Sequence, residues 1–404
     1  MKKTILLFCI IFYYFLSQSQ DTWIQKDSVN GPPRSSCASF VLNGEGFVVG
    51  GIDIIEFKRK MYSYDVEQDD WDNELSVGGI NGAGLNRGGA IAFATNTKGY
   101  VGLGQGNGVP FFNDLWEYDP ISNTWTQKAS FIGSSRRLAV CFEINGIAYV
   151  GTGQDANGFT KDFYKYDAST NSWTQIADFG GSARKGAVGF SMGNQGYVGT
   201  GDEGILVNDF WQYNPSTDTW TEKASFPGSA RSGASGWGIF PTAFIACGYD
   251  NSFNYKKDVW EYNYFSNTWT QRSNFDGPKR TSATAFVIDG IAYLGLGYNG
   301  SFLDDFWAYT PILSVDEYKN TLTLYTYPNP TTDFVTFNLN FNFDSNYQLN
   351  LFNSNGQSIN SLINVQIIGT QLLIDLSSVP KGIYFYQFLV PDDLINFTGK
   401  LIVQ

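Results

Sequence analysis

Hydrophobic and polar residues alternate along much of the chain, in short runs that end at turn residues. In one stretch, Arg137 to Glu143 alternates apolar and polar residues and meets a hairpin turn at Asn145-Gly146. Ile147 to Val150 is more continuously apolar, which indicates an inner strand. Aromatic residues alternate with polar ones from Asp162 to Asp167, and Ser172 to Gln175 follows after another turn. The pattern predicts a unit of four short antiparallel strands.

This unit occurs six times, with key residues at fixed offsets. A Trp is followed by an Arg eleven residues later in five units, and the unit that starts at Trp71 has five residues more. A Gly stands 17 residues after each Arg, and an aromatic-x-Tyr pair follows. A period of 47 to 54 residues indicates an array of equal supersecondary units. The repeated arginines are Arg34, Arg87, Arg136, Arg184, Arg231 and Arg280.

The two ends of the array indicate how it closes. The last unit ends at Tyr309, and Asp316 stands where the next Trp is due. Conversely, Trp23 to Lys26 has the pattern of a last strand without a unit of its own. We therefore expect this N-terminal strand to complete the sixth sheet, since an unpaired sheet edge would otherwise remain. Six units of four strands predict an all-β, six-bladed propeller.

The units resemble the kelch motif, in which a diglycine is followed by an aromatic residue and then by a Trp. The resemblance covers residues 20–311 and implies a kelch-type β-propeller, similar to the central domain of galactose oxidase. Only Gly50-Gly51 is a true diglycine, and four units carry Gly-x-Gly instead. The remaining unit has Ala246-Cys247-Gly248. We expect these glycines to let strands crowd around the axis, where a Cβ would clash.

From Tyr325 the chain changes to Ile, Leu, Val, Phe and Asn without Trp, which predicts a small Ig-like β-sandwich. The ordered segments YPNP, NGQ, IDLS, GIY and GKLIV resemble the type A C-terminal sorting domain of the type IX secretion system. The resemblance implies that residues 325–404 engage the type IX machinery and that the protein reaches the surface or exterior of a Gram-negative bacterium. An ordinary carbohydrate-binding or adhesion sandwich is the alternative. Residues 312–324 are then the expected linker.

The N-terminus predicts a signal peptide over residues 1–19. Lys2-Lys3 precedes an apolar stretch from Thr4 to Leu16, and Ser17-Gln18-Ser19 has the pattern of a cleavage site. Thirteen residues are too few to span a bilayer well, so no transmembrane helix is expected after cleavage, with an uncleaved anchor as the alternative. The net charge of −12, without a run of Lys or Arg, makes nucleic acid an unfavourable partner.

The chain contains no His, which excludes His-metal sites and His-dependent nucleophile systems. The copper chemistry of galactose oxidase is excluded for the same reason, and no metal or cofactor is expected. Cys37, Cys141 and Cys247 remain beyond the leader, and their odd number does not permit a complete disulfide framework. Buried, unpaired thiols are expected. The candidate bases, none with a partner at a recognisable spacing, are Glu56, Asp155, Asp202, Glu203 and Asp250.

The loop that enters the first strand of a blade and the loop between its second and third strands open on the same face. The six arginines are therefore expected to form a ring on one rim, and Asp residues that begin the third strands should join them. In one interpretation each Arg bonds an Asp or a loop carbonyl and holds the blades in register. In the other, some guanidinia point into a central funnel and bind an anionic ligand. The aspartates are Asp114, Asp162, Asp209, Asp258 and Asp305, and Lys60 interrupts their series.

The loops between second and third strands differ from blade to blade, as recognition loops do. Their aromatic residues are Phe111, Phe112, Phe159, Tyr249, Phe253, Tyr255, Tyr298 and Phe302. Aromatic side chains above an Arg-lined funnel suit a sugar with a carboxylate, or an extended peptide. We therefore expect a non-catalytic protein that binds a glycan or a protein with this rim. Two alternatives remain: a sugar mutarotase, epimerase or lyase, by analogy with six-bladed kelch-type sialic-acid mutarotases, and a structural adhesin without a small-molecule site.

Overall fold

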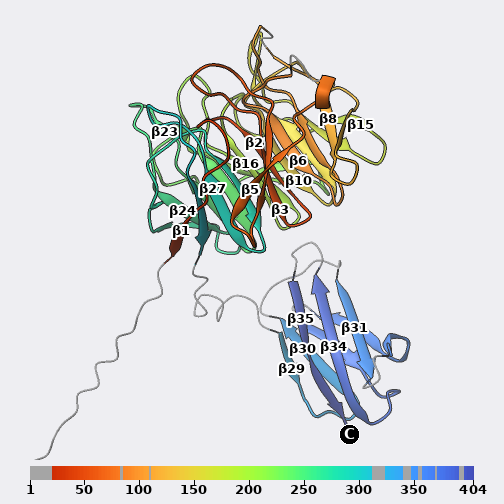
Figure 1. Ribbon diagram of the computed structural model, residues 1–404. Coiled ribbons are helices and arrows are strands. Elements are labelled where there is room, and N and C mark those ends of the chain that lie inside the picture. Colours follow the sequence, from red (N-terminus) through yellow and green to blue (C-terminus); the bar gives the residue numbers. More distant parts are fainter. Residues whose placement is uncertain are drawn as a thin grey trace, which may run out of the picture.

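The computed structural model of the chain describes residues 21–81, 85–108, 111–311, 324–339, 347–353, 357–368, 371–390 and 395–404. The described residues are almost entirely β-structure, and four-stranded antiparallel sheets form the larger part (Figure 1). The expected signal peptide, residues 1–19, and the Asn355-Gly356 turn lie outside the described residues. The expected linker, 312–324, also lies outside them except for Leu324, which begins a strand.

Each repeat forms one sheet, because its alternating residues give every strand one face toward each neighbouring sheet. The first sheet contains β2 (Ala38–Leu42), β3 (Glu45–Val49), β4 (Met61–Asp65) and β5 (Asp70–Glu74). The second contains β6 (Ile91–Ala94), β7 (Gly99–Gly102), β8 (Leu115–Asp119) and β9 (Thr124–Gln127). The third contains β10 (Val140–Ile144), β11 (Ile147–Gly151), β14 (Phe163–Asp167) and β15 (Ser172–Ile176).

The other three sheets follow the same order. The fourth contains β16 (Val188–Met192), β17 (Gln195–Gly199), β18 (Phe210–Asn214) and β19 (Thr219–Glu222). The fifth contains β21 (Ser235–Ile239), β22 (Thr242–Ala246), β24 (Val259–Asn263) and β25 (Thr268–Arg272). The sixth contains β26 (Thr284–Ile288), β27 (Ile291–Gly295), β28 (Phe306–Thr310) and β1 (Thr22–Lys26). Short pairings on the loops join β12 (Gln154–Asp155) to β13 (Gly158–Phe159), and β20 (Arg231–Ser232) to β23 (Tyr249–Asp250).

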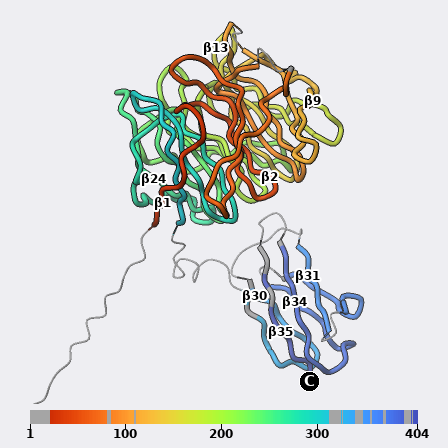
Figure 2. Tube along the Cα trace, in the orientation of Figure 1, coloured from red at the N-terminus to blue at the C-terminus, as the bar shows by residue number. Residues whose placement is uncertain are grey.

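The sixth sheet is completed by the N-terminal strand, as the sequence predicts. Strand β1 pairs antiparallel with β28, and Trp23 lies opposite Tyr309. In Figure 2 the red start of the described chain lies beside the blue-green trace of this sheet. The Trp23 ring is 6% exposed and stacks on the ring of Tyr309. The first and last strands of the ring therefore belong to one sheet.

The first strand of each sheet faces the axis. The strands β2, β6, β10, β16, β21 and β26 contact one another in turn around the ring, and β26 contacts β2. The apolar segment that the sequence marks as an inner strand, Ile147 to Val150, belongs to β11, which is second from the axis. Strand β11 is continuously apolar because neighbouring sheets cover both of its faces. Its burial is therefore not a sign that it lies next to the axis.

Two sets of backbone hydrogen bonds join neighbouring sheets. The repeated Gly of each unit donates its N–H to the carbonyl of the Arg in the next unit, and Gly297 closes the set by donating to Arg34 at 2.9 Å. These glycines have φ between +90° and +107°, a conformation that favours glycine. In the second set, the residue two positions after each Arg donates its N–H to the carbonyl of the equivalent residue in the preceding unit. Ser36 closes this set by donating to the Ser282 carbonyl at 3.0 Å. The repeated Gly and Arg positions therefore hold the ring together through their backbones.

Aromatic rings fill the space between sheets. The Phe40 ring packs where a side chain at Gly99 of the next sheet would stand, and Phe142 packs on Gly196 in the same way. The turn between the third and fourth strands of a sheet carries an Asp or Asn. Its carboxyl or amide oxygen accepts a hydrogen bond from the hydroxyl of the repeated Tyr of that sheet. Asn171, for example, accepts from Tyr166 at 2.8 Å and from the N–H of Ala129 at 2.9 Å. Asn171 thus joins its own sheet to the segment that follows the preceding sheet.

The C-terminal part forms two sheets around a separate core. One contains β29 (Leu324–Tyr327), β30 (Phe334–Leu339), β33 (Gln371–Asp375) and β32 (Asn364–Ile368), and the other contains β31 (Gln348–Asn353), β34 (Gly382–Val390) and β35 (Ile395–Val403). Buried residues from both sheets, among them Phe337, Leu351 and Phe388, make one cluster. The two sheets therefore form a β-sandwich.

Candidate functional site

The six repeated arginines lie inside the blades. Each is 0–1% exposed. Four pair with the Asp that precedes the third strand, at 2.7 Å for Arg87–Asp114, 2.6 Å for Arg136–Asp162, 2.7 Å for Arg231–Asp258 and 2.5 Å for Arg280–Asp305, and Arg184 pairs with Asp209. The guanidinia also donate to backbone carbonyls, as Arg231 does to Cys247 at 2.9 Å and to Ser229 at 3.0 Å. Their donors are engaged within the protein.

The first unit lacks this Asp, because Lys60 stands in its place. There the Arg34 guanidinium donates to the Tyr62 hydroxyl at 3.1 Å and to the Pro32 carbonyl at 3.0 Å. Burial acts to raise the pKa of Asp162 and Asp258, but the bonded arginines Arg136 and Arg231 lower it by more, so the net result is a lowered pKa for both carboxyls. All six arginines thus hold the first and third strands of their blades together, and the structure places none of them on the surface of a funnel.

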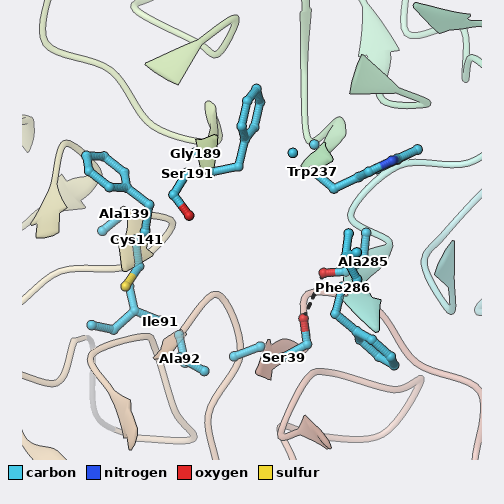
Figure 3. Close-up of a pocket in the computed structure, with 17 residues that line it drawn as sticks. Ser39, Ile91, Ala92, Ala139, Cys141, Gly189, Ser191, Trp237, Ala285 and Phe286 are labelled. Atoms are coloured by element: carbon cyan, nitrogen blue, oxygen red, sulfur yellow. Dashed lines mark hydrogen bonds between the residues drawn. The ribbon is translucent and has the colours of Figure 1, made fainter. Parts of the chain in front are cut away.

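A central cavity of about 350 Å³ lies between the first strands (Figure 3). Small side chains line it: the hydroxyl of Ser39 donates to the Ala285 carbonyl at 3.1 Å, and Cys141 and Gly189 lie on the other sheets. The residues that line the cavity carry no charged side chain, so its wall offers little chemistry. Glu143 lies two residues beyond Cys141 on β10, and burial raises its pKa.

We call the residues that directly follow each repeated Arg the mouth residues, because each lies two to four positions before a residue that lines the cavity. Arg137, for example, lies two residues before Ala139, which lines the cavity. Each mouth residue bridges antiparallel to the residue after the repeated Gly of its unit, as Arg137 does to Gln154 and Lys185 to Asp202. The mouth residues vary between units, from small residues in four units to a cation in two, whereas the residues beneath them repeat. They are Ser35, Gly88, Arg137, Lys185, Ser232 and Thr281.

Two cations, Arg137 and Lys185, lie side by side at this mouth. Both are partly buried, and both donate to the side-chain oxygen of Gln154, at 3.0 Å and 3.3 Å. Desolvation lowers the pKa of Arg137. The sequence interpretation missed both residues because it followed columns common to all units. The available signal was a second cation directly after the repeated Arg in two neighbouring units.

The rim aromatics divide into two groups. The Phe112 ring lies 4.4 Å from the buried Arg87 guanidinium carbon, and the Phe159 ring lies 5.0 Å from the Lys185 nitrogen. On the fifth and sixth blades, Tyr255 contacts Tyr298 edge to face, with ring centroids 6.1 Å apart. Tyr249 stacks on Phe253, whose ring is 79% exposed. The second group offers ring faces and phenol groups close to the mouth.

No metal site is visible in the part of the chain that the structure describes, since no group of three or more Cys, Asp or Glu side chains is positioned to hold an ion. Cys37, Cys141 and Cys247 are unpaired, as expected, but only Cys247 is fully buried, and Cys37 and Cys141 are partly exposed. Among the described residues, no helix is long and apolar enough to cross a membrane.

Three comparisons place these features among known proteins. Residues 325–404 match the family described as the secretion system C-terminal sorting domain. No curated protein matches the sequence of the chain. Among solved structures, the chain is similar to one described as the structure of YjhT, with a TM-score of 0.60 and 17% identity. The similarity covers 70% of this chain and 97% of the other.

The structural similarity shows that the two proteins share a fold. The C-terminal match indicates secretion to the cell surface or the extracellular space, and engagement of the secretion machinery by the sandwich.

Proposed function

We propose that this protein binds a glycan outside the cell, without catalysis, at the mouth of the central cavity. The observation that carries the proposal is the difference between blades at the mouth. Beneath it, every unit repeats the same Arg and Gly contacts, whereas at the mouth four units carry a small residue and two neighbouring units carry the cations Arg137 and Lys185. Differences confined to the ends of a repeated scaffold are typical of recognition surfaces.

The chemistry of the mouth suits a sugar. Cations and amides from the second to fourth blades provide donors, and the tyrosines Tyr249, Tyr255 and Tyr298 on the fifth and sixth blades provide ring faces. Sugars are commonly bound by aromatic faces together with a few oriented polar groups, as in other concave sites. Export to the cell exterior, which the C-terminal family indicates, brings this surface into contact with extracellular glycans.

A glycan array probed with the full-length purified protein tests the proposal. Binding to a defined set of glycans is expected, and Tyr298→Ala should weaken it by about tenfold because stacking on this ring would be lost. Phe265→Ala is a matched control, since this partly exposed aromatic residue packs on Phe240 instead of on the mouth residues. Absence of binding to every glycan would contradict the proposal.

A mutarotase or epimerase acting on an acidic sugar is the second candidate. It is favoured by a carboxylate beside a cation at the mouth, with Asp202 at 3.8 Å from Lys185. Such a pair of acid and cation can move a proton at a sugar. NMR of anomer exchange in N-acetylneuraminate distinguishes the two candidates: a binding protein leaves the exchange rate unchanged, and an enzyme increases it.

A further inference from the structure

Arg137 and Lys185 bring two positive charges close together. Because both bond the same oxygen of Gln154, their nitrogens lie no farther apart than the sum of two hydrogen-bond lengths. Arg137 also donates to the side-chain oxygen of Gln105 from the neighbouring blade. Like charges at this separation repel one another, and the neutral amide oxygens compensate only part of that repulsion.

Among the described residues, carboxylates balance only part of the charge of this pair. In the described part of the chain, Arg137 has no carboxylate within ion-pair distance, and the carboxylate nearest to Lys185 is that of Asp202, at 3.8 Å. Comparable rim lysines have close partners: Lys58 lies 2.9 Å from Asp53, and Lys256 lies 2.6 Å from Asp250. This positive excess occurs in a chain with a net charge of −12. The contrast indicates a site that is completed by an anion from outside.

The pair is also held in position before any ligand binds. The Arg137 guanidinium carbon lies 5.9 Å from the centroid of the Phe111 ring, and the Phe159 ring packs against Lys185. The bridge between Arg137 and Gln154 anchors the backbone on the third blade. A guanidinium with fixed neighbours loses less freedom on binding, and its planar fork matches the two oxygens of a carboxylate.

We infer that Arg137 and Lys185 form the subsite that holds an anionic group, a carboxylate or a sulfate, of an acidic sugar. This inference rests on the proposed glycan-binding function. Arg137 contacts the anion through its N–H groups and Lys185 through its ammonium, while the tyrosines of the next two blades face the remainder of the sugar. The repeated arginines, buried and paired, take no part in the contact.

The test uses the full-length protein and immobilised oligosaccharides in matched sets that differ only in a terminal glucuronate, a 6-sulfated glucose or glucose. The wild type should prefer an acidic set over the neutral one by at least about tenfold at low salt. That preference should weaken as salt rises. The double variant R137Q/K185Q should lose the preference, and R137K should retain part of it.

The control variant K58Q removes one positive charge from the same face but leaves the pair intact, so it should keep the preference. A preference confined to glucuronate identifies a carboxylate site, and one confined to the sulfated sugar identifies a sulfate site. Equal binding of acidic and neutral sugars by the wild type would overturn the inference and leave the proposed function standing. An unchanged preference in R137Q/K185Q, shown to be folded by circular dichroism, would overturn it as well. Failure of every glycan to bind would remove both proposals.

Discussion

Replacing Trp23 with Ala tests whether the N-terminal strand holds the ring closed. The Trp23 ring is 6% exposed and packs against Tyr309 and Phe275, with ring centroids 4.6 Å and 4.7 Å away. It also meets Trp237 of the fifth sheet edge to face at 6.5 Å. Truncation would therefore open a void between the fifth and sixth sheets and weaken the pairing of β1 with β28.

The magnitude follows from these contacts. Removal of a buried Trp side chain costs about 3–5 kcal/mol, including the cavity that remains. The indole N–H of Trp23 has no hydrogen-bond partner among the described residues, so no hydrogen bond is lost. By contrast, the indole of Trp173 donates to the Ala129 carbonyl at 3.0 Å. We therefore expect a loss of about 4 kcal/mol in the free energy of unfolding for Trp23→Ala.

Urea unfolding followed by tryptophan fluorescence measures this loss. All 11 Trp residues lie between Trp23 and Trp307, so the signal reports only the ring of sheets. Ile24→Ala is the matched control, because Ile24 is 53% exposed on the other face of β1, and it should change stability by less than about 0.5 kcal/mol. If Trp23→Ala unfolds at the same urea concentration as Ile24→Ala, the N-terminal strand does not hold the ring closed.

Three further predictions concern the buried groups of the blades. Asp258→Asn should cost about 3–5 kcal/mol at pH 7, because Arg231 is left buried without its counter-charge. Since the folded-state pKa of Asp258 is lowered, its stabilising contribution is present above the unfolded pKa of about 3.9 and is lost as pH falls through the folded value. Urea midpoints of wild type and Asp258→Asn should therefore converge below about pH 4, and a constant difference down to pH 3 would contradict this. Cys247 is buried, and burial raises its pKa to about 12, so its thiol should not react with a disulfide reagent at pH 8 until urea unfolds the protein; rapid labelling of Cys247 in the native protein would show that it is accessible. Gly153→Ala should destabilise by more than about 1 kcal/mol, because φ is +106° and the new Cβ would approach the Arg137 carbonyl, and urea unfolding no different from the wild type would contradict that reason.

The strands and the closing pair were predictable because they depend on local alternation and on a count of units. Which strand of each sheet faces the axis could not be predicted in this way. In β2 the axis-facing residues include Ser39, and in β16 they include Gly189 and Ser191, all small because the first strands converge there. In the sequence, these small axis-facing residues resemble residues that face solvent. The first strand of each sheet, in which they alternate with apolar residues, was therefore not recognised as the innermost strand.

The candidate site shows the opposite limit of sequence reasoning. A column common to all units, such as Arg136 and its equivalents, is selected by the needs of the fold, and the structure places it inside the blades. Recognition requires differences between units, and these occur at Arg137 and Lys185, where no column exists. Arg137 and Lys185 lie close together because of how neighbouring sheets meet at the axis, where both donate to Gln154. The order of repeats along the sequence does not reveal that geometry.

The pairing of β1 with β28 also determines the order in which the ring can form. The partner of Thr22 is Thr310, so the N-terminal strand has no place to pair until almost the entire array has been synthesised. During that interval β1 is an isolated strand, and its sequence TWIQK suits this state, since Gln25 and Lys26 keep it soluble and discourage pairing with other chains. Completion of the ring is therefore a late, long-range event, of the kind that folds slowly.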